Sequence, residues 1–277
     1  MKYKNIEMFI ILGIIIIGAV LISGCTDSSE VQDTHVETSE DDAHTEDVTV
    51  DDAHTEEVAE HWGYEGEGGP EYWAELGYPD CSGNEQSPID IPAGTPVHSA
   101  DISFNYDPSA LNIVNNGHSI KVDYDEGSSI EVENMTYNLL QLHFHSLSEN
   151  TINGEYSEME MHLVHQSDTG EYAVIGVMMD GGSENSAYAP IWEYMPAEVG
   201  EVEKISNVTV DADDLLPATK TYYRFDGSFT TPPCTEGVNW FLMDTPVELS
   251  TEQINAFKLI YANNNRPVQP LNDREFY

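Results

Sequence analysis

The chain has 277 residues, of which 51 are Asp or Glu and nine are Lys or Arg, so its formal net charge is -42. With so few cations to neutralise phosphate, the composition argues against nucleic-acid binding and against direct binding to anionic lipid headgroups. A hydrophobic content of 40% is enough for a sizeable core, and the length suits one large domain or two small ones.

Residues 1–24 have the features of an export signal. Two lysines precede an apolar run, Met8 to Ile22, which is short for a membrane span and is followed by small residues. The last three residues of this segment together with the next, Ile-Ser-Gly-Cys, resemble a prokaryotic lipobox, in which Cys25 is lipidated. We expect a lipoprotein-type signal peptide and attachment to the outer face of the cytoplasmic membrane or cell envelope. An ordinary signal peptide or an uncleaved anchor is the alternative.

Residues 25–60 are predicted to be an acidic, disordered tether. The stretch 26–60 holds 14 acidic residues and no Phe, Trp or Tyr, so it cannot bury enough apolar surface to offset chain entropy. His35, His44 and His54 could bind a metal weakly, but a solvated spacer is the favoured interpretation, because scattered histidines form no preorganised site.

The acidic excess continues into residues 61–277, which hold 36 acidic and seven basic residues. Two interpretations remain for this excess. One is a soluble, charged surface, and the other is adaptation to high salt, which screens the repulsion between carboxylates. An imbalance that is spread over a folded domain favours the second, halophilic interpretation.

Composition changes at His61, and residues 61–277 are predicted to form one mainly β domain with a few surface helices. A helix is expected after Ser250, which can cap it with Gln253, and a shorter one over about 187–194. Ile254, Phe257 and Tyr261 would form the apolar stripe of the first helix. Short alternating apolar runs separated by Gly, Asn, Asp and Ser predict strands at 102–106, 119–124, 129–133, 138–145, 160–165 and 172–178.

The chain has three cysteines, and the lipobox uses one of them. The remaining pair, Cys81 and Cys234, predicts one disulfide in an exported domain. Its long loop would stabilise the fold by about 4–5 kcal/mol in the chain-entropy model.

Histidines on two predicted strands indicate a metal site. His143 and His145 are two residues apart, so on a strand both imidazoles project from the same side. His162 and His165 lie on another predicted strand, and one of them can complete a three-nitrogen tetrahedral site with one open position, which is typical of a catalytic zinc. Any one of these histidines alone could instead be a hydrogen-bonded structural residue, and a three-histidine site accepts several divalent ions.

The blocks around these histidines resemble the alpha-class carbonic anhydrases, across essentially all of residues 61–277. The resemblance implies a large, mostly antiparallel twisted sheet with zinc at the base of a cone. It also implies hydration of CO2 to bicarbonate and a proton by zinc-bound hydroxide. The resembling blocks are His61–Tyr64, Gly69-Pro70, Gln86–Asp90, Asn115–His118, Gln141–His145, Ser148-Glu149, Glu160–His165, Gly227–Glu236, Trp240 and Asn264–Gln269.

The same resemblance implies roles for individual residues. His143, His145 and His162 would bind zinc, whereas His165 would not. Thr230 would accept a hydrogen bond from the hydroxide and donate one to Glu149. His118 would be the proton shuttle, with an ordinary pKa near 6.5, and Tyr64 would order the water chain. Gln141, Glu160 and the backbone carbonyl of Asn264 would orient the zinc ligands. Thr231 would line the substrate side, and an apolar wall would hold CO2, formed by Val164, Val174, Phe229 and Trp240.

Four positions depart from the family pattern. Phe229 is larger than the usual Leu, Phe225 replaces a common Tyr, and Ser146 and Asn150 replace the Trp and His of animal forms. None is a metal ligand, so they bear on rate and packing more than on the reaction.

Two other functions stay open. One is a carbonic-anhydrase-like binding domain without activity, and the other is a zinc-scavenging lipoprotein. The presence of all three zinc histidines argues against the first. The oligomeric state also stays open, a homodimer included.

Overall fold

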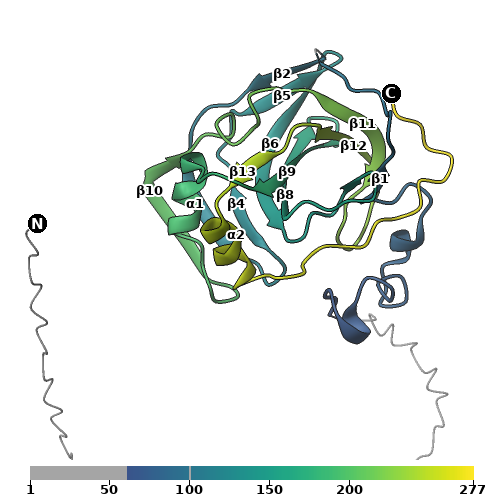
Figure 1. Cartoon of the computed structure of the whole chain (residues 1–277), viewed down its shortest axis with the longest axis horizontal. Coiled ribbons are helices and arrows are strands. Elements are labelled where there is room, and N and C mark those ends of the chain that lie inside the picture. The colour runs from purple at the N-terminus through teal and green to yellow at the C-terminus, as the bar shows by residue number, and fades with distance from the viewer. Residues whose placement is uncertain (1–60, 100) are drawn as a thin grey trace, which may run out of the picture. The chain divides into compact units, whose positions relative to one another are not determined.

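The computed structural model describes residues 61–99 and 101–277, and the expected signal peptide, tether and Cys25 lie outside them. The described residues are mainly β, as predicted, and are organised around one 11-stranded sheet (Figure 1). No helix within these two ranges is long and apolar enough to cross a membrane.

Most neighbouring strands of the large sheet are antiparallel, also as predicted. The order is β10-β3-β4-β6-β8-β9-β12-β11, while β5 pairs with β6 and with β2, and β13 pairs with β9. Only the pairs β9–β12 and β9–β13 are parallel. The strands of this sheet are β2 (Ile102–Asn105), β3 (Ser109–Asn115), β4 (Ile120–Asp123), β5 (Ser129–Val132), β6 (Met135–His145), β8 (Met159–Ser167), β9 (Tyr172–Gly181), β10 (Val202–Val210), β11 (Tyr222–Ser228), β12 (Glu236–Met243) and β13 (Val247–Leu249).

A second, two-stranded parallel sheet joins β1 (Asp90–Ile91) to β7 (Thr151–Ile152). All six predicted strands are present, with ends that differ by a few residues. Seven further strands, β1, β3, β7 and β10 to β13, were not predicted. The edge strand β10 lacks the apolar alternation that marks a strand, because most of its residues are exposed. The last four residues of β12 are all buried, so they form a continuous apolar run.

The predicted helix after Ser250 is α2 (Thr251–Lys258). Its capping box is formed as predicted, with the Ser250 side chain and the Gln253 side chain each accepting from the other residue's backbone N–H. Ile254 and Phe257 are buried, but Tyr261 lies beyond the end of the helix and was wrongly included in its stripe. The shorter predicted helix is a 3-10 turn, η3 (Ser186–Tyr188), followed by α1 (Ala189–Glu193); two further 3-10 turns, η1 (Gly66–Gly68) and η2 (Pro79–Ser82), precede β1.

The two faces of the central strands carry different residues, because side chains alternate along a strand. On one face, Leu142 and Phe144 of β6 and Leu163 of β8 belong to the main apolar core. The residues between them on the opposite face include His143 and His162, and beside these Val164 belongs to a smaller apolar cluster. The strand period therefore brings the metal-binding side chains to one face of the sheet, next to an apolar patch.

Candidate metal centre and cavity

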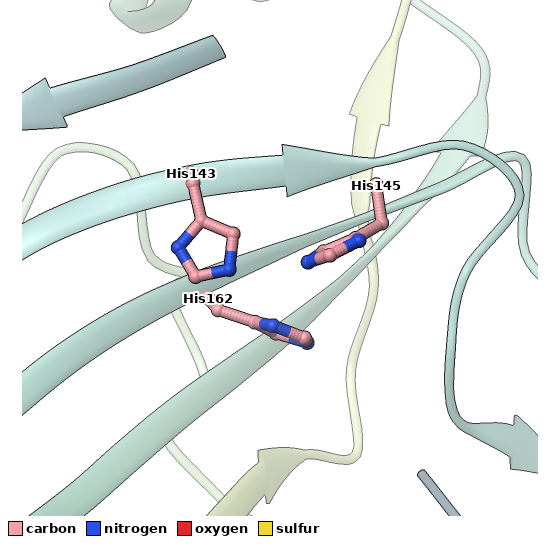
Figure 2. Close-up of side chains that lie close together, drawn as sticks. All are labelled: His143, His145 and His162. Carbon is pink, nitrogen blue, oxygen red and sulfur yellow. The ribbon is translucent and has the colours of Figure 1, made fainter. Parts of the chain in front are cut away.

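The three predicted zinc histidines lie together on strands β6 and β8. His143 pairs directly with His162 in the antiparallel register, and His145 is two residues further along β6. One ring nitrogen from each of the three lies within 4.8 Å of the other two. Figure 2 shows the rings converging on one point from the two strands.

Each imidazole has its other ring nitrogen held by an acceptor. His143 Nδ1 lies 2.9 Å from Gln141 Oε1, and His162 Nε2 lies 2.9 Å from Glu160 Oε1. His145 Nδ1 lies 2.7 Å from the backbone oxygen of Asn264. These acceptors fix the tautomers. The nitrogens that remain, Nε2 of His143, Nε2 of His145 and Nδ1 of His162, face one another.

The donor set fits a zinc ion. His145 Nε2 is buried and meets no hydrogen-bond partner in residues 61–99 and 101–277, which is costly for a polar atom unless a metal binds it. Three neutral imidazole nitrogens are the ligands of many catalytic zinc sites, in which a fourth position stays open. The sequence analysis identified all three histidines and all three of their acceptors.

Glu160 is a buried carboxylate whose acceptor capacity is fully used. Besides His162 it accepts hydrogen bonds of 2.8 Å from the backbone N–H groups of Glu149 and Asn150, and one of 2.7 Å from Asn150 Nδ2. Burial alone would raise its pKa, but His162 and the Asn150 hydrogen bonds outweigh burial and hold the pKa below its usual value. Asn150, a departure from the family pattern, thus supports the residue that orients His162.

Glu149 is a second buried carboxylate beside the histidines. Its Oε1 accepts a 2.8 Å hydrogen bond from the backbone N–H of Arg266, and its Oε2 lies 3.5 Å from His145 Nε2. Burial raises its pKa to about 7, against the opposing influence of His162, the Arg266 N–H and the hydroxyl of Thr230. Thr230 is itself 5% exposed. Glu149 Oε2 is buried and meets no hydrogen-bond partner within residues 61–99 and 101–277, so the predicted hydrogen bond from Thr230 to Glu149 stays a prediction.

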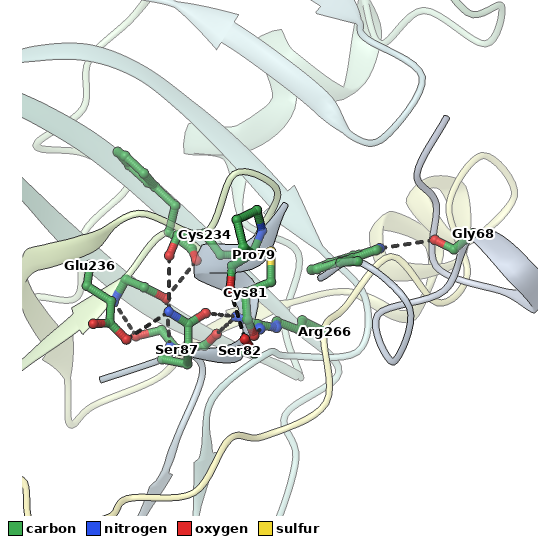
Figure 3. Close-up of a disulfide and its surroundings, with 12 residues drawn as sticks. Gly68, Pro79, Cys81, Ser82, Ser87, Cys234, Glu236 and Arg266 are labelled. Carbon is green, nitrogen blue, oxygen red and sulfur yellow. Dashed lines mark hydrogen bonds between the residues drawn. A yellow bond between two sulfur atoms is a disulfide. The ribbon is translucent and has the colours of Figure 1, made fainter. Parts of the chain in front are cut away.

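Arg266 is a structural residue that the sequence analysis did not single out. Its guanidinium is buried over the Trp73 ring and donates 2.8 Å hydrogen bonds to Gln86 Oε1 and to the backbone oxygens of Ser87 and Cys81. Figure 3 shows it beside the predicted Cys81–Cys234 disulfide, which the structure contains. Arg266 thus binds Cys81 and the Gln86-Ser87 pair through its side chain, while its backbone N–H holds Glu149. Its only signal in the sequence was its place in the Asn-Asn-Arg-Pro-Val-Gln block.

A cavity of about 140 Å³ opens over His143 and His145. At the edge of this cavity, the His118 ring stacks on the Trp62 ring, with ring centroids 3.6 Å apart. The His61 ring meets the His118 ring edge-on, with ring centroids 5.7 Å apart. Burial, and secondarily the charge of His61, lower the pKa of His118, so the ordinary value expected from the sequence is corrected downwards. The residues that line the cavity are Trp62, Tyr64, Asn116, His118, Ser119, Lys121, Gln141, His143, His145 and Thr231.

Tyr64 and Thr231, both predicted site residues, are thus brought to the cavity. The hydroxyl of Tyr64 is buried, and burial raises its pKa well above the usual range. Because this hydroxyl stays protonated, it can act as a hydrogen-bond donor to water in the cavity.

The four residues that were predicted to hold CO2 also lie together. Val164, Val174 and Trp240 form part of the smaller apolar cluster, and Phe229 packs against it. The Trp240 ring lies 4.9 Å from the His162 ring, so this patch adjoins the metal centre. Phe225 stacks parallel to Trp240, where an apolar ring needs no hydrogen-bond partner.

His165 lies apart from the metal group, as predicted. Its ring is buried on the opposite face of β8, where its Nε2 lies 2.8 Å from the hydroxyl of Tyr106. Ser146, another departure, donates its backbone N–H to Asn264 Oδ1 at 2.9 Å, and so helps to hold the residue whose carbonyl orients His145.

Comparisons with known proteins agree with this geometry. A carbonic anhydrase from Nostoc sp. is 41% identical over 223 residues, which cover 77% of this chain and 84% of that relative. One from Klebsiella pneumoniae is 42% identical over 222 residues, covering 78% and 90%. The structure of an alpha-carbonic anhydrase from Thermovibrio ammonificans, bound to the inhibitor sulfanilamide, is similar with a TM-score of 0.75 and 42% identity, covering 78% of this chain and 98% of that one.

A more distant structural neighbour has another kind of ligand. It is dioscorin complexed with ascorbate, at 29% identity and a TM-score of 0.73. The family model of eukaryotic-type carbonic anhydrase matches residues 68–277. The chain therefore belongs to the alpha-type carbonic anhydrase family.

Proposed function

We propose that this protein catalyses the reversible, zinc-dependent hydration of CO2 to bicarbonate and a proton, outside the cytoplasmic membrane. The observation that carries the proposal is the set of three facing imidazole nitrogens, each with its other ring nitrogen held by an acceptor. When bound there, zinc would supply a Lewis acid that brings the pKa of water near neutrality, as is established for carbonic anhydrases in general.

The side chains around this centre have complementary tasks. Thr230 donates a hydrogen bond from its hydroxyl to the Glu149 carboxylate, which leaves the hydroxyl oxygen free to accept. Such an acceptor orients a ligand that carries a proton and disfavours one that does not. The apolar cluster of Val164, Val174 and Trp240 holds CO2, which needs no hydrogen bond, beside the three histidines.

The direct test is a stopped-flow assay of CO2 hydration on the purified, zinc-loaded chain. We expect activity that is lost on chelation of zinc and restored when zinc is returned. The inactive binding domain predicts no turnover, and the zinc-scavenging lipoprotein predicts delivery of zinc to an acceptor without turnover. Either result would exclude the proposed reaction.

His118 is proposed to carry protons between the cavity and solvent. The His118→Ala variant should turn over more slowly in weak buffer, while kcat/KM for CO2 stays nearly unchanged, because proton export follows the attack on CO2. Added imidazole should restore the rate, since it can replace the missing ring on a water-linked path. The lowered pKa of His118 favours release of its proton to solvent. A variant with full rate in dilute buffer would assign the shuttle to another group.

The N-terminal segment is proposed to export the protein and to attach it through lipid on Cys25. Mass spectrometry of the protein from membranes of its host should find a lipid-modified N-terminus at Cys25, with residues 1–24 absent. An unmodified cysteine, or a retained signal, would leave the domain without this anchor.

The acidic surface is proposed to be an adaptation to salt. Residues 61–277 hold 36 acidic and seven basic residues, so repulsion should lower stability at low ionic strength, and screening within about 10 Å at 0.1 M should relieve it. The melting temperature should therefore rise from low to molar salt. A flat dependence would indicate an ordinary charged surface.

A further inference from the structure

One cation lines the cavity of this strongly acidic protein. Among the residues that line it, Lys121 is the one Lys or Arg, and Asp and Glu are absent from the lining within the described ranges. The folded region has only seven basic residues in total. The cavity therefore contains one of the few positive charges of a strongly acidic domain.

The sheet directs Lys121 to the metal face. Lys121 pairs directly with His143 across β4 and β6, and directly opposed residues point to the same face of a sheet. Its neighbours Ile120 and Val122 point the other way, into the main core. Its Nζ lies 2.6 Å from Asp123 Oδ1, and its side chain is 30% exposed, so the charge remains accessible to a ligand in the cavity.

The other basic residues have different surroundings. Lys220 and Lys258 form ion pairs with Asp213 and Glu158, and Arg224 pairs with Glu133. None of these pairs lines the cavity. The ion pair of Lys258 is a close match to that of Lys121, because its lysine is 28% exposed and has one carboxylate partner.

We propose that Lys121 is an anion-binding residue that favours bicarbonate in the cavity and acts chiefly on the bicarbonate side of the reaction. This inference rests on the proposed function. The negative field of the whole protein disfavours an incoming anion, and a cation at the cavity, where the walls lower the local dielectric, offsets that field. Neutral CO2 brings no charge into the cavity, so its entry does not depend on Lys121.

The first test replaces the charge and compares two reaction directions in the zinc-loaded full chain. In Lys121→Met, the low-pH plateau of kcat/KM for bicarbonate should fall by about three- to tenfold at low salt, while the high-pH plateau of kcat/KM for CO2 changes less than about twofold. Because the overall equilibrium fixes the ratio of the two kcat/KM values at any one pH, the midpoint of both pH profiles should rise by about 0.5–1 pH unit at the same time. Lys121→Arg, which keeps the charge, should stay near the wild type. Molar salt should shrink the difference, because it screens the charge.

A second measurement reads anion binding without turnover. Calorimetric titration with azide should give a dissociation constant about three- to tenfold higher in Lys121→Met and lower than wild type in Asp123→Asn, which frees the lysine from its partner. Lys258→Met removes the same charge outside the cavity and should leave azide binding unchanged.

Equal weakening in Lys121→Met and Lys258→Met would assign the effect to net charge and overturn the proposal, as would unchanged azide binding in Lys121→Met. Absence of CO2 hydration in the wild type would instead refute the proposed function, while the azide titration would still report whether Lys121 binds anions.

Discussion

Replacement of His162 by alanine is expected to remove zinc from the purified protein and to abolish CO2 hydration. The other two imidazoles would remain, but a site with two histidines loses one of its three protein ligands and the geometry of a tetrahedral centre. The loss of zinc affinity should exceed the 10- to 100-fold that removal of a ligand's hydrogen-bond partner costs. Metal analysis after dialysis, together with the hydration assay, measures both effects.

The same strand offers a matched control. His165 is also buried on β8, but its ring faces Tyr106 on the opposite side of the sheet. His165→Ala should lower stability, because it leaves a cavity and an unpartnered hydroxyl, yet it should retain about one zinc per chain. Full zinc retention in His162→Ala, or equal zinc loss in both variants, would contradict the assignment of the ligands.

A third variant distinguishes the loss of a zinc ligand from the loss of the residue that orients a ligand. Gln141→Ala leaves all three imidazoles in place and removes only the acceptor 2.9 Å from His143 Nδ1. Zinc affinity should fall by roughly 10- to 100-fold, which is less than in His162→Ala. This order of effects follows directly from the two positions around the metal.

The sequence supported accurate prediction of the central strands, because their chemistry follows the strand period. His143, His145 and His162 alternate with core residues such as Leu142 and Phe144, so both the strands and the shared face of the ligands could be inferred. Edge strand β10 could not be inferred in this way, because its solvent-exposed residues are mostly polar on both faces. Its position depends on pairing with β3, which is distant in the sequence.

Residues that act through long-range contacts were harder to identify. Arg266 contacts Gln86 and Cys81, which lie about 180 residues away, and nothing local to Arg266 signals these partners. Lys121 was counted as one of seven basic residues, and its place opposite His143 depends on the register of β4 against β6. Periodicity gives the face on which a side chain lies within its strand, but the neighbouring strand must be known to identify what it meets.

Replacement of Thr230 by alanine is expected to lower turnover by about 10²-fold or more while zinc stays bound. Thr230 is 5% exposed, and its hydroxyl helps to hold down the pKa of the Glu149 carboxyl. Without that hydroxyl, the buried carboxyl would lose its proposed donor, and the centre would lose the proposed acceptor that orients a proton-bearing ligand. Because neither residue binds the metal in the proposed arrangement, zinc content should remain near one per chain.

Thr230→Ser tests whether the hydroxyl is responsible. Serine keeps the donor and acceptor and removes only a methyl group, so it should recover most of the activity that alanine loses. Loss of zinc in Thr230→Ala would instead indicate that the loop before Cys234 holds the centre together. A Thr230→Ala enzyme with the wild-type rate would exclude the hydroxyl from catalysis. The combination of retained zinc, a slow alanine variant and a fast serine variant is the result that the proposed hydrogen bond from Thr230 to Glu149 requires.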